Sequence, residues 1–179
     1  MNTKRGLRPA FLLPNENHRH LRQPSRAIVE PGAAACRGQS RIDVQIYEGL
    51  GSLPHFNPDD DVEGATPPPA VGELRTLLAS AGGILISSPE YAHGVPGSLK
   101  NALDWLVSDG ALVDKPVALI NASPVGGEFA RDSLVETLRT MNWRVTGTWS
   151  SPKKVRDENV DDDVVGVIRE ALKSLVGVA

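Results

Sequence analysis

The chain has few of the features that define several large protein classes. Its single cysteine, Cys36, excludes an internal disulfide and a zinc site built from several cysteines. Aromatic residues make up only 4% of the 179 residues. No apolar run approaches the roughly 20 residues that a membrane-spanning helix needs. We therefore expect no membrane partner, and the single cysteine is compatible with a reducing, cytoplasmic location.

What is present indicates a globular domain. Hydrophobic residues make up 40% of the chain and charged residues 23%, values typical of globular proteins. A chain of this length most simply forms one domain and buries roughly 70% of its unfolded surface.

Charge is distributed unevenly along the chain. Residues 1–41 contain eight Lys or Arg and two Glu, whereas residues 42–179 contain eleven Lys or Arg and twenty Asp or Glu. The acidic body gives no reason to expect nucleic-acid binding. The basic arm allows a nucleic-acid tail or a transit peptide, but it has few serines and no clear amphipathic period. We therefore predict no nucleic-acid partner.

From residue 42 onward, strand and helix patterns alternate. The apolar runs at 84–86 and 116–122 are typical of strands buried on both faces of a parallel sheet. Further strands are predicted at 42–47 and 143–149, and helices at about 66–81, 97–107, 128–141 and 161–176. This alternation predicts a doubly wound α/β sheet.

The most informative segment follows the apolar run at 84–86. Residues 89–97 contain two prolines and two glycines, and a helical pattern follows them. The prolines stiffen this loop, and the glycines let its backbone approach a ligand closely. Open α/β sheets bind ligands at the carboxyl ends of their strands, so we predict a binding site here.

Three pieces of this segment resemble, in a fixed order, the signature of the NADPH-dependent FMN reductase family. These pieces are Pro89-Glu90-Tyr91, Gly94-Val95-Pro96-Gly97 and Leu99-Lys100-Asn101-Ala102-Leu103-Asp104-Trp105. The resemblance runs from about Ile42 to the C-terminus. It implies a flavodoxin-like three-layer sandwich whose five-stranded parallel sheet has the order 2-1-3-4-5. It also implies bound FMN, NADPH or NADH as co-substrate, a small-molecule electron acceptor, and a homodimer or homotetramer.

The resemblance further implies which residues contact FMN. Those predicted around the flavin ring are Pro89, Glu90, Tyr91, Gly94, Val95, Ser123, Gly126 and Gly127. The cofactor carries the redox chemistry, so we predict no catalytic triad or other catalytic side chain. The scattered histidines lack metal-ligand spacing, and no metal site is predicted.

Several side chains near this loop allow two interpretations. Glu90 either accepts backbone hydrogen bonds or is a solvated carboxylate. His93 is either a proton donor to a reduced quinone or an exposed residue of a turn. Phe56 packs either over the flavin of a neighbouring subunit or in its own core. Trp105 is expected to pack in the core or at a subunit interface.

The first 41 residues depart from the family pattern, and we treat them as a divergent segment preceding a domain at 42–179. The candidate first strand, 10–13, is short and lies between two prolines. In the family a Gly-Ser-Leu-Arg-x-x-Ser phosphate loop follows this strand. Here Arg22 and Ser25 match that loop and are predicted to bind phosphate, but Arg19 and His20 replace the glycine and serine.

Three interpretations of this segment stay open. It forms a divergent strand and loop, it is partly disordered with weak FMN binding, or it is unrelated sequence such as a frame error. The predicted function is an FMN-dependent NAD(P)H oxidoreductase that passes a hydride through flavin to a quinone, flavin, azo compound or metal oxyanion. The alternatives are a non-catalytic flavodoxin-like protein with impaired FMN binding and a single-electron carrier.

Overall fold

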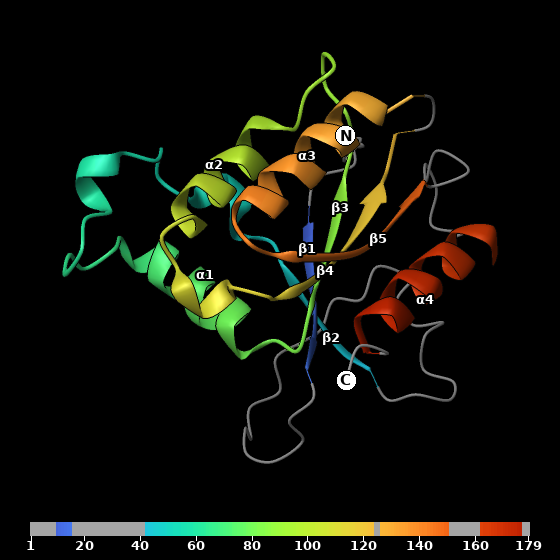
Figure 1. The fold of residues 1–179 in the computed structure, drawn as a ribbon, viewed down its shortest axis with the longest axis horizontal. Helices are drawn as coiled ribbons and strands as arrows, with labels where there is room; N and C mark the ends of the chain where they lie inside the picture. Colours follow the sequence, from blue (N-terminus) through green and yellow to red (C-terminus); the bar gives the residue numbers. More distant parts are fainter. Residues whose placement is uncertain (1–9, 16–41, 124–125, 151–161, 177–179) are drawn as a thin grey trace, which may run out of the picture.

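The computed structural model of the chain describes residues 10–15, 42–123, 126–150 and 162–176 (Figure 1). The elements in this part of the chain are β1 (Ala10–Asn15), β2 (Asp43–Tyr47), α1 (Pro69–Ser80), β3 (Ile84–Ser88), α2 (Gly97–Leu106), β4 (Pro116–Asn121), α3 (Glu128–Thr140), β5 (Arg144–Ser150) and α4 (Asp162–Val176). The strands and helices predicted from residue 42 onward are all present, and their ends differ from the predictions by a few residues.

Local chemistry explains where the first helix begins and ends. Pro69 occupies the first turn of α1, where the missing N–H of proline costs no helical hydrogen bond. At the other end, the Lys115 ammonium donates to the carbonyl oxygens of Ala79 (3.0 Å) and Ala81 (2.8 Å). These oxygens lack partners within the helix, so the lysine completes its C-terminus. Burial lowers the pKa of Lys115.

The sheet has the predicted strand order, β2-β1-β3-β4-β5. Within the sheet, the neighbouring strands β3, β4 and β5 are parallel to one another, as a flavodoxin-like fold requires. The prediction that all five strands are parallel is wrong, because β1 runs antiparallel to both β2 and β3. In this register Ala10 pairs with Ser87, and Leu12 pairs with Leu85.

The reversed direction of β1 has a simple physical reason and a consequence. A short apolar run between prolines carries no information about direction, and antiparallel pairing is slightly more favourable per residue. Because Ala10 lies beside Ser87, the carboxyl end of β1 lies at the edge of the sheet where β3 begins. Asn15 is therefore about 20 Å, or six residues at about 3.3 Å each, from the end of the sheet where Ser88 closes β3.

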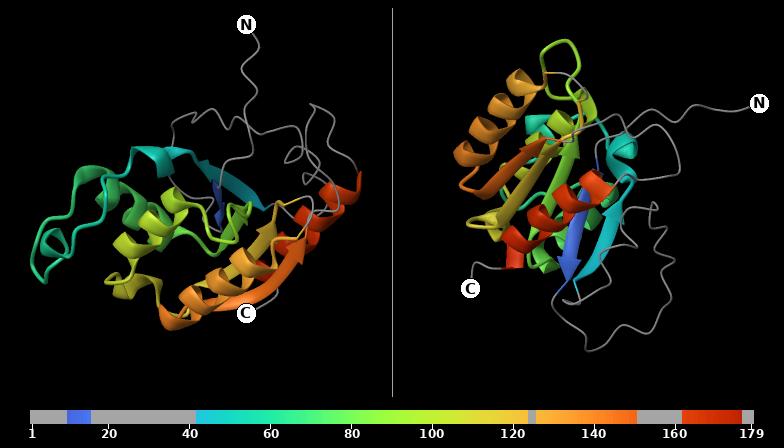
Figure 2. Two further views of the ribbon diagram at one scale, coloured as in Figure 1. Left: turned by 90° about the horizontal axis from the view of Figure 1, so that it is seen from above. Right: turned by 90° about the vertical axis from the view of Figure 1, so that its right-hand side faces the viewer.

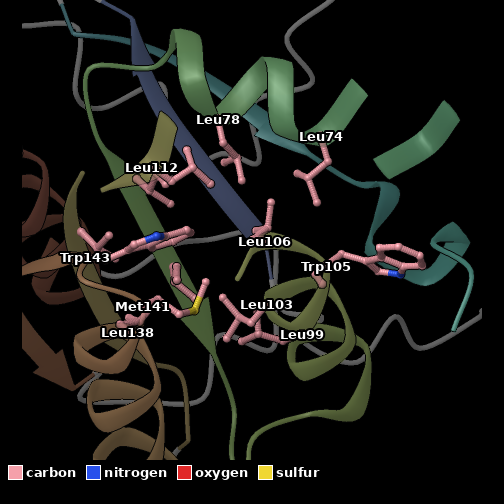
Figure 3. Close-up of a cluster of buried hydrophobic side chains, with 14 of the residues drawn as sticks. Leu74, Leu78, Leu99, Leu103, Trp105, Leu106, Leu112, Leu138, Met141 and Trp143 are labelled. Carbon is pink, nitrogen blue, oxygen red and sulfur yellow. The ribbon is translucent and has the colours of Figure 1, made fainter. Parts of the chain in front are cut away.

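Helices cover both faces of the sheet, which gives the three layers that were predicted (Figure 2). Side chains of α1, α2 and α3 pack on one face, against Ile84, Ile86, Val117 and Leu119. On the other face α4 packs through Ala171, Leu172 and Leu175 against Leu85, Ala118 and Ile120. The alternation along β3 and β4 places successive side chains in different layers, as strand geometry requires. Figure 3 shows the larger cluster, in which Leu74, Leu78, Leu99, Leu103, Trp105, Leu106, Leu112 and Leu138 are buried.

The loop that follows β2 is fastened to α2. The Trp105 indole N–H and the Asn101 amide both donate to the carbonyl oxygen of Pro54, each at 2.9 Å. Asn101 also accepts from the backbone N–H of Phe56 at 2.8 Å. The Phe56 ring packs edge-on against Trp105, with 5.1 Å between ring centroids. Phe56 thus packs within its own chain, and Trp105 is a fully buried core residue (Figure 3).

A second polar cluster joins the same loop to α1 and to the end of α2. The Arg75 guanidinium donates to Asp61 at 2.8 Å and to Ser108 at 2.9 Å, and it also contacts the carbonyl oxygen of Trp105. Ser108 donates to the second Asp61 oxygen at 2.7 Å. Burial of Asp61 raises its pKa, but the hydrogen bonds from Arg75 and Ser108 and the charge of Arg75 outweigh this effect. The pKa of Asp61 is therefore below its ordinary value.

Candidate functional site

Two loops begin side by side at the carboxyl edge of the parallel strands. Ser88, the last residue of β3, pairs with Asn121, the last residue of β4. The N–H of Ala122 then donates to the carbonyl oxygen of Ser88 at 2.9 Å, which continues the contact beyond the strands. In Figure 1 the loop after β3 and the start of α3 lie at this same edge.

The first loop contains a tight two-residue turn. Tyr91 and Gly94 exchange backbone hydrogen bonds of 3.1 and 2.9 Å, and the residues between them are Ala92 and His93. Both have positive φ, 49° and 59°, as a type I′ turn requires. Neither is a glycine, so this backbone conformation costs roughly 1–2 kcal/mol per residue. Strain of this kind is common at ligand-binding sites.

The second loop is organised by the side chain of Asn121. Its amide nitrogen donates to the carbonyl oxygen of Gly126, and its amide oxygen accepts from the N–H of Ser123, both at 2.9 Å. The backbone of Gly127 has φ 94°, and a Cβ built there would lie 2.1 Å from the Asn121 amide nitrogen. Glycine is therefore required at 127 both for its backbone conformation and for space. Sequence reasoning missed Asn121, although a polar residue that ends a buried apolar strand is a usable signal.

Glu90 connects the two loops. Its backbone N–H donates to the Ser123 hydroxyl at 2.7 Å. Its carboxylate accepts from the backbone N–H of Ala130, in the first turn of α3, at 2.8 Å. Of the two interpretations of Glu90, the structure therefore shows the carboxylate that accepts a backbone hydrogen bond.

Aromatic side chains form a second contact between the same segments. The rings of His93 and Phe129 stack with 4.4 Å between centroids and 14° between planes. Phe129 is 59% exposed and Tyr91 57% exposed, so both present aromatic surface at this edge. The role of His93 as a proton donor stays a prediction.

The structure brings most of the predicted site residues to one edge of the sheet. The first loop holds Pro89, Glu90, Tyr91, Gly94 and Val95, and the second holds Ser123, Gly126 and Gly127. The predicted phosphate ligands Arg22 and Ser25 lie outside the described residues. Within the described part of the chain, no group of His, Cys, Asp or Glu side chains is arranged to hold a metal ion. No helix there is long and apolar enough to cross a membrane.

The described half of the site fits the ring of FMN. Two loops with turn glycines meet at the carboxyl ends of adjacent parallel strands, where flat ligands bind in doubly wound folds. The Gly126 backbone is exposed and has φ 74°, and among the described residues only one atom, at 3.8 Å, lies near the position of its missing Cβ. The backbone of this loop is therefore accessible to a planar ligand.

Comparison with known proteins identifies the family. The chain belongs to the NADPH-dependent FMN reductase family, whose model matches residues 22–155. It is 30% identical over 145 residues to an NADPH azoreductase from Bacillus sp. (strain OY1-2), a match that covers 75% of this chain and 76% of that protein. It is 37% identical over 87 residues to a quinone reductase from Escherichia coli (strain K12), covering 48% of this chain and 45% of that protein.

Another relative is the NADH:(hydroxy)cinnamate reductase subunit CrdA from Vibrio ruber, 37% identical over 86 residues. That match covers 48% of this chain and 41% of the relative. The chain thus matches less than half the length of two of these relatives. These relatives are named for different electron acceptors, and each name describes that relative alone.

Solved structures show the same fold. The NAD(P)H:(acceptor) oxidoreductase FerB from Paracoccus denitrificans superimposes with a TM-score of 0.55 at 20% identity, covering 88% of this chain and 91% of that one. The apo form of the NADH:FMN oxidoreductase EMOB superimposes with a TM-score of 0.51 at 18% identity, covering 88% and 86%. Because both sequence identities are low, the comparison concerns the fold alone, which is the flavodoxin-like α/β fold.

Proposed function

We propose that the chain is an FMN-dependent NAD(P)H oxidoreductase that passes a hydride from the nicotinamide, through bound flavin, to a small-molecule acceptor. The observation that carries this proposal is the pair of loops joined through Glu90 at the carboxyl ends of β3 and β4. FMN supplies the redox chemistry when it is bound, and the protein supplies binding, orientation and exclusion of water. The acceptor class comprises quinones, flavins, azo compounds and metal oxyanions.

The roles of the site residues follow from their places. Pro89, Tyr91, Gly94 and Val95 would hold the edge of the flavin ring through the backbone of the first loop. Gly126 and Gly127 would let the second loop approach the ring. Arg22 and Ser25 are the proposed phosphate ligands, because guanidinium and hydroxyl groups both donate to phosphate oxygens. The names of the relatives, an azoreductase and a quinone reductase, support the acceptor class.

Acceptor turnover tests this function. The purified protein, incubated with FMN, should oxidise NADPH or NADH in the presence of a benzoquinone or an azo dye, and protein lacking flavin should not. A Gly127→Ala variant should lose most of this activity, because its new Cβ meets Asn121. Equal NAD(P)H oxidation with and without the protein would contradict the proposal.

By family analogy we also propose a homodimer or homotetramer, which light scattering after size-exclusion chromatography tests.

A second candidate function is favoured by the direction of β1. In the parallel arrangement, the chain leaves the first strand at the same edge as the flavin loops, whereas here β1 ends at the opposite edge. This observation supports a flavodoxin-like protein with weak FMN binding. Loss of charge-assisted phosphate hydrogen bonds would cost roughly 1.5–3 kcal/mol each. Since about 1.4 kcal/mol corresponds to a factor of ten in affinity, each lost hydrogen bond would weaken FMN binding about tenfold or more. An FMN dissociation constant above about 100 μM would favour this candidate.

A further inference from the structure

We infer that Glu90 is a positioning residue that holds the two flavin loops at a fixed separation. This inference rests on the proposed function, because its consequence is the affinity for FMN. The residue is assigned no redox or proton-transfer role. It acts on the cofactor through α3 and through the loop that precedes this helix.

The first step of the argument is the position of the two hydrogen bonds. The backbone of Glu90 contacts Ser123, at the start of the second loop, and its carboxylate contacts Ala130, after that loop has ended. Glu90 therefore spans the second loop from one side to the other. Neither of these two anchored positions can move away from Glu90 without breaking one of the contacts.

The second step is that α3 lacks a local cap. The residue before its first turn is Gly127, which has no side chain to accept from the helix N–H groups. The first four N–H groups of a helix have no partner within it. The Glu90 carboxylate supplies an acceptor for one of them, that of Ala130, across 40 positions of the sequence. A carboxylate is also the favoured charge at this end of the helix dipole.

The third step links this cap to the flavin loop. Gly127 is the last residue of the second loop and directly precedes α3, and its neighbour Gly126 is held by Asn121. A displacement of the first turn of α3 would therefore move the backbone proposed to approach the ring. The stack of His93 on Phe129 crosses the same gap, but both rings are exposed, and within the described part of the chain no hydrogen bond fixes them.

Substitutions separate the acceptor from the charge. Glu90→Gln keeps an oxygen that can accept from Ala130, whereas Glu90→Ala removes it. Glu128→Ala is the matched control, because Glu128 is exposed in the same first turn of α3, so its removal takes away a negative charge near the helix N-terminus. If the hydrogen bond is what matters, E90A differs from wild type, whereas E90Q and E128A resemble it.

The experiment combines hydrogen exchange without flavin and FMN titration by fluorescence quenching. In E90A we expect faster exchange in peptides covering residues 122–132, and an FMN dissociation constant raised about tenfold, the effect of a lost helix cap of about 1.4 kcal/mol. In E90Q and E128A the dissociation constant should stay within about threefold of wild type. Thermal unfolding identifies a variant that has lost its fold, and Ser123→Ala, which breaks the other contact, then replaces E90A.

The outcomes separate the two claims. Unchanged exchange at 122–132 and unchanged FMN affinity in E90A would overturn the positioning role, with the proposed function intact. Wild-type protein that takes up no FMN would overturn the proposed function and, with it, the effect on FMN. The exchange rates would in that case still show whether Glu90 holds the two loops together. A loss in E128A as large as that in E90A would overturn the assignment to the hydrogen bond.

Discussion

At the scale of single residues, adjacent glycines in the second loop have different reasons for being glycine. Gly126 and Gly127 both have positive φ, 74° and 94°. A Cβ at Gly126 would make an ordinary contact of 3.8 Å with the Glu128 carboxylate, whereas a Cβ at Gly127 would overlap the Asn121 amide that also binds the carbonyl oxygen of Gly126. Position 126 needs glycine for its backbone conformation alone, whereas position 127 also needs it because a Cβ has no space there.

This difference predicts unequal effects of alanine. Gly126→Ala should destabilise the fold by about 1–2 kcal/mol, the cost of a left-handed conformation for a residue with a Cβ. Gly127→Ala should cost about 1–3 kcal/mol more, because the new Cβ displaces Asn121 from a packed site. Urea unfolding measures both, with Gly126→Ala as the control. Equal midpoints for the two variants would contradict the described geometry of this loop.

A second prediction at this scale concerns the pH dependence of stability. The pKa of Asp61 is lowered in the folded state, so the folded chain binds fewer protons there than the unfolded chain. The resulting stabilisation is fully present above the unfolded pKa of about 3.9, and it is lost as the pH falls through the folded value. Asp61→Asn should destabilise at pH 7 by about 1–3 kcal/mol, because it leaves Arg75 with a weaker partner.

Urea unfolding at several pH values from 7 to 3 checks this prediction. The difference between wild type and D61N should shrink as the pH falls, since the wild-type carboxylate is then protonated as well. Asp59→Asn is the control, because Asp59 is an exposed residue of the same loop. A difference between wild type and D61N that stays constant across this range would show that Asp61 does not contribute through its charge.

At the scale of elements, α2 organises more than its own layer. It packs five buried side chains into the core, and it also holds the loop after β2 through Asn101 and Trp105. The helix follows directly from the 89–97 loop, since Pro96 precedes its first turn. One helix thus connects the candidate flavin loop to a segment about 40 positions earlier in the sequence.

The contributions of Asn101 and Trp105 to this clamp, the hydrogen bonds that hold Pro54 and Phe56 on α2, should be separable by substitution. Asn101→Ala removes one donor to Pro54 and the acceptor for Phe56, but the Trp105 indole still reaches Pro54. We expect a loss of about 1–2 kcal/mol and faster hydrogen exchange at residues 53–57, with exchange in α2 unchanged. Trp105→Phe removes buried volume as well as a hydrogen bond and should cost about 2–4 kcal/mol. Unchanged exchange at 53–57 in N101A would contradict the clamp.

At the scale of the whole molecule, the sequence predicts elements better than directions. From residue 42 onward, long apolar runs and helical periodicity predict the strands and helices that the structure contains. The segment at 10–13 is only a short candidate strand, in a region with three open interpretations; it is present as β1, and its predicted direction came from the family resemblance. Four apolar residues between two prolines fit either direction, so this prediction had no physical basis in the residues themselves.

The candidate site divides in a similar way. Its loops could be predicted, because prolines, glycines and a preceding buried strand are local signals. The contacts that hold the loops together could not, because Glu90 and Ala130 are 40 positions apart and only the packing of α3 brings them together. Asn121 gave a weak signal as the polar end of an apolar strand. Arg22 and Ser25 stay predictions, since they lie outside the described residues.

The central claim, that the two loops form a flavin site, is tested most directly by the visible absorption spectrum. The purified protein is incubated with excess FMN, separated from free flavin by gel filtration, and mixed with NADPH under anaerobic conditions. The account predicts flavin bands near one FMN per chain that bleach on addition of NADPH. A colourless protein after gel filtration, with no FMN bound in a titration, would contradict it.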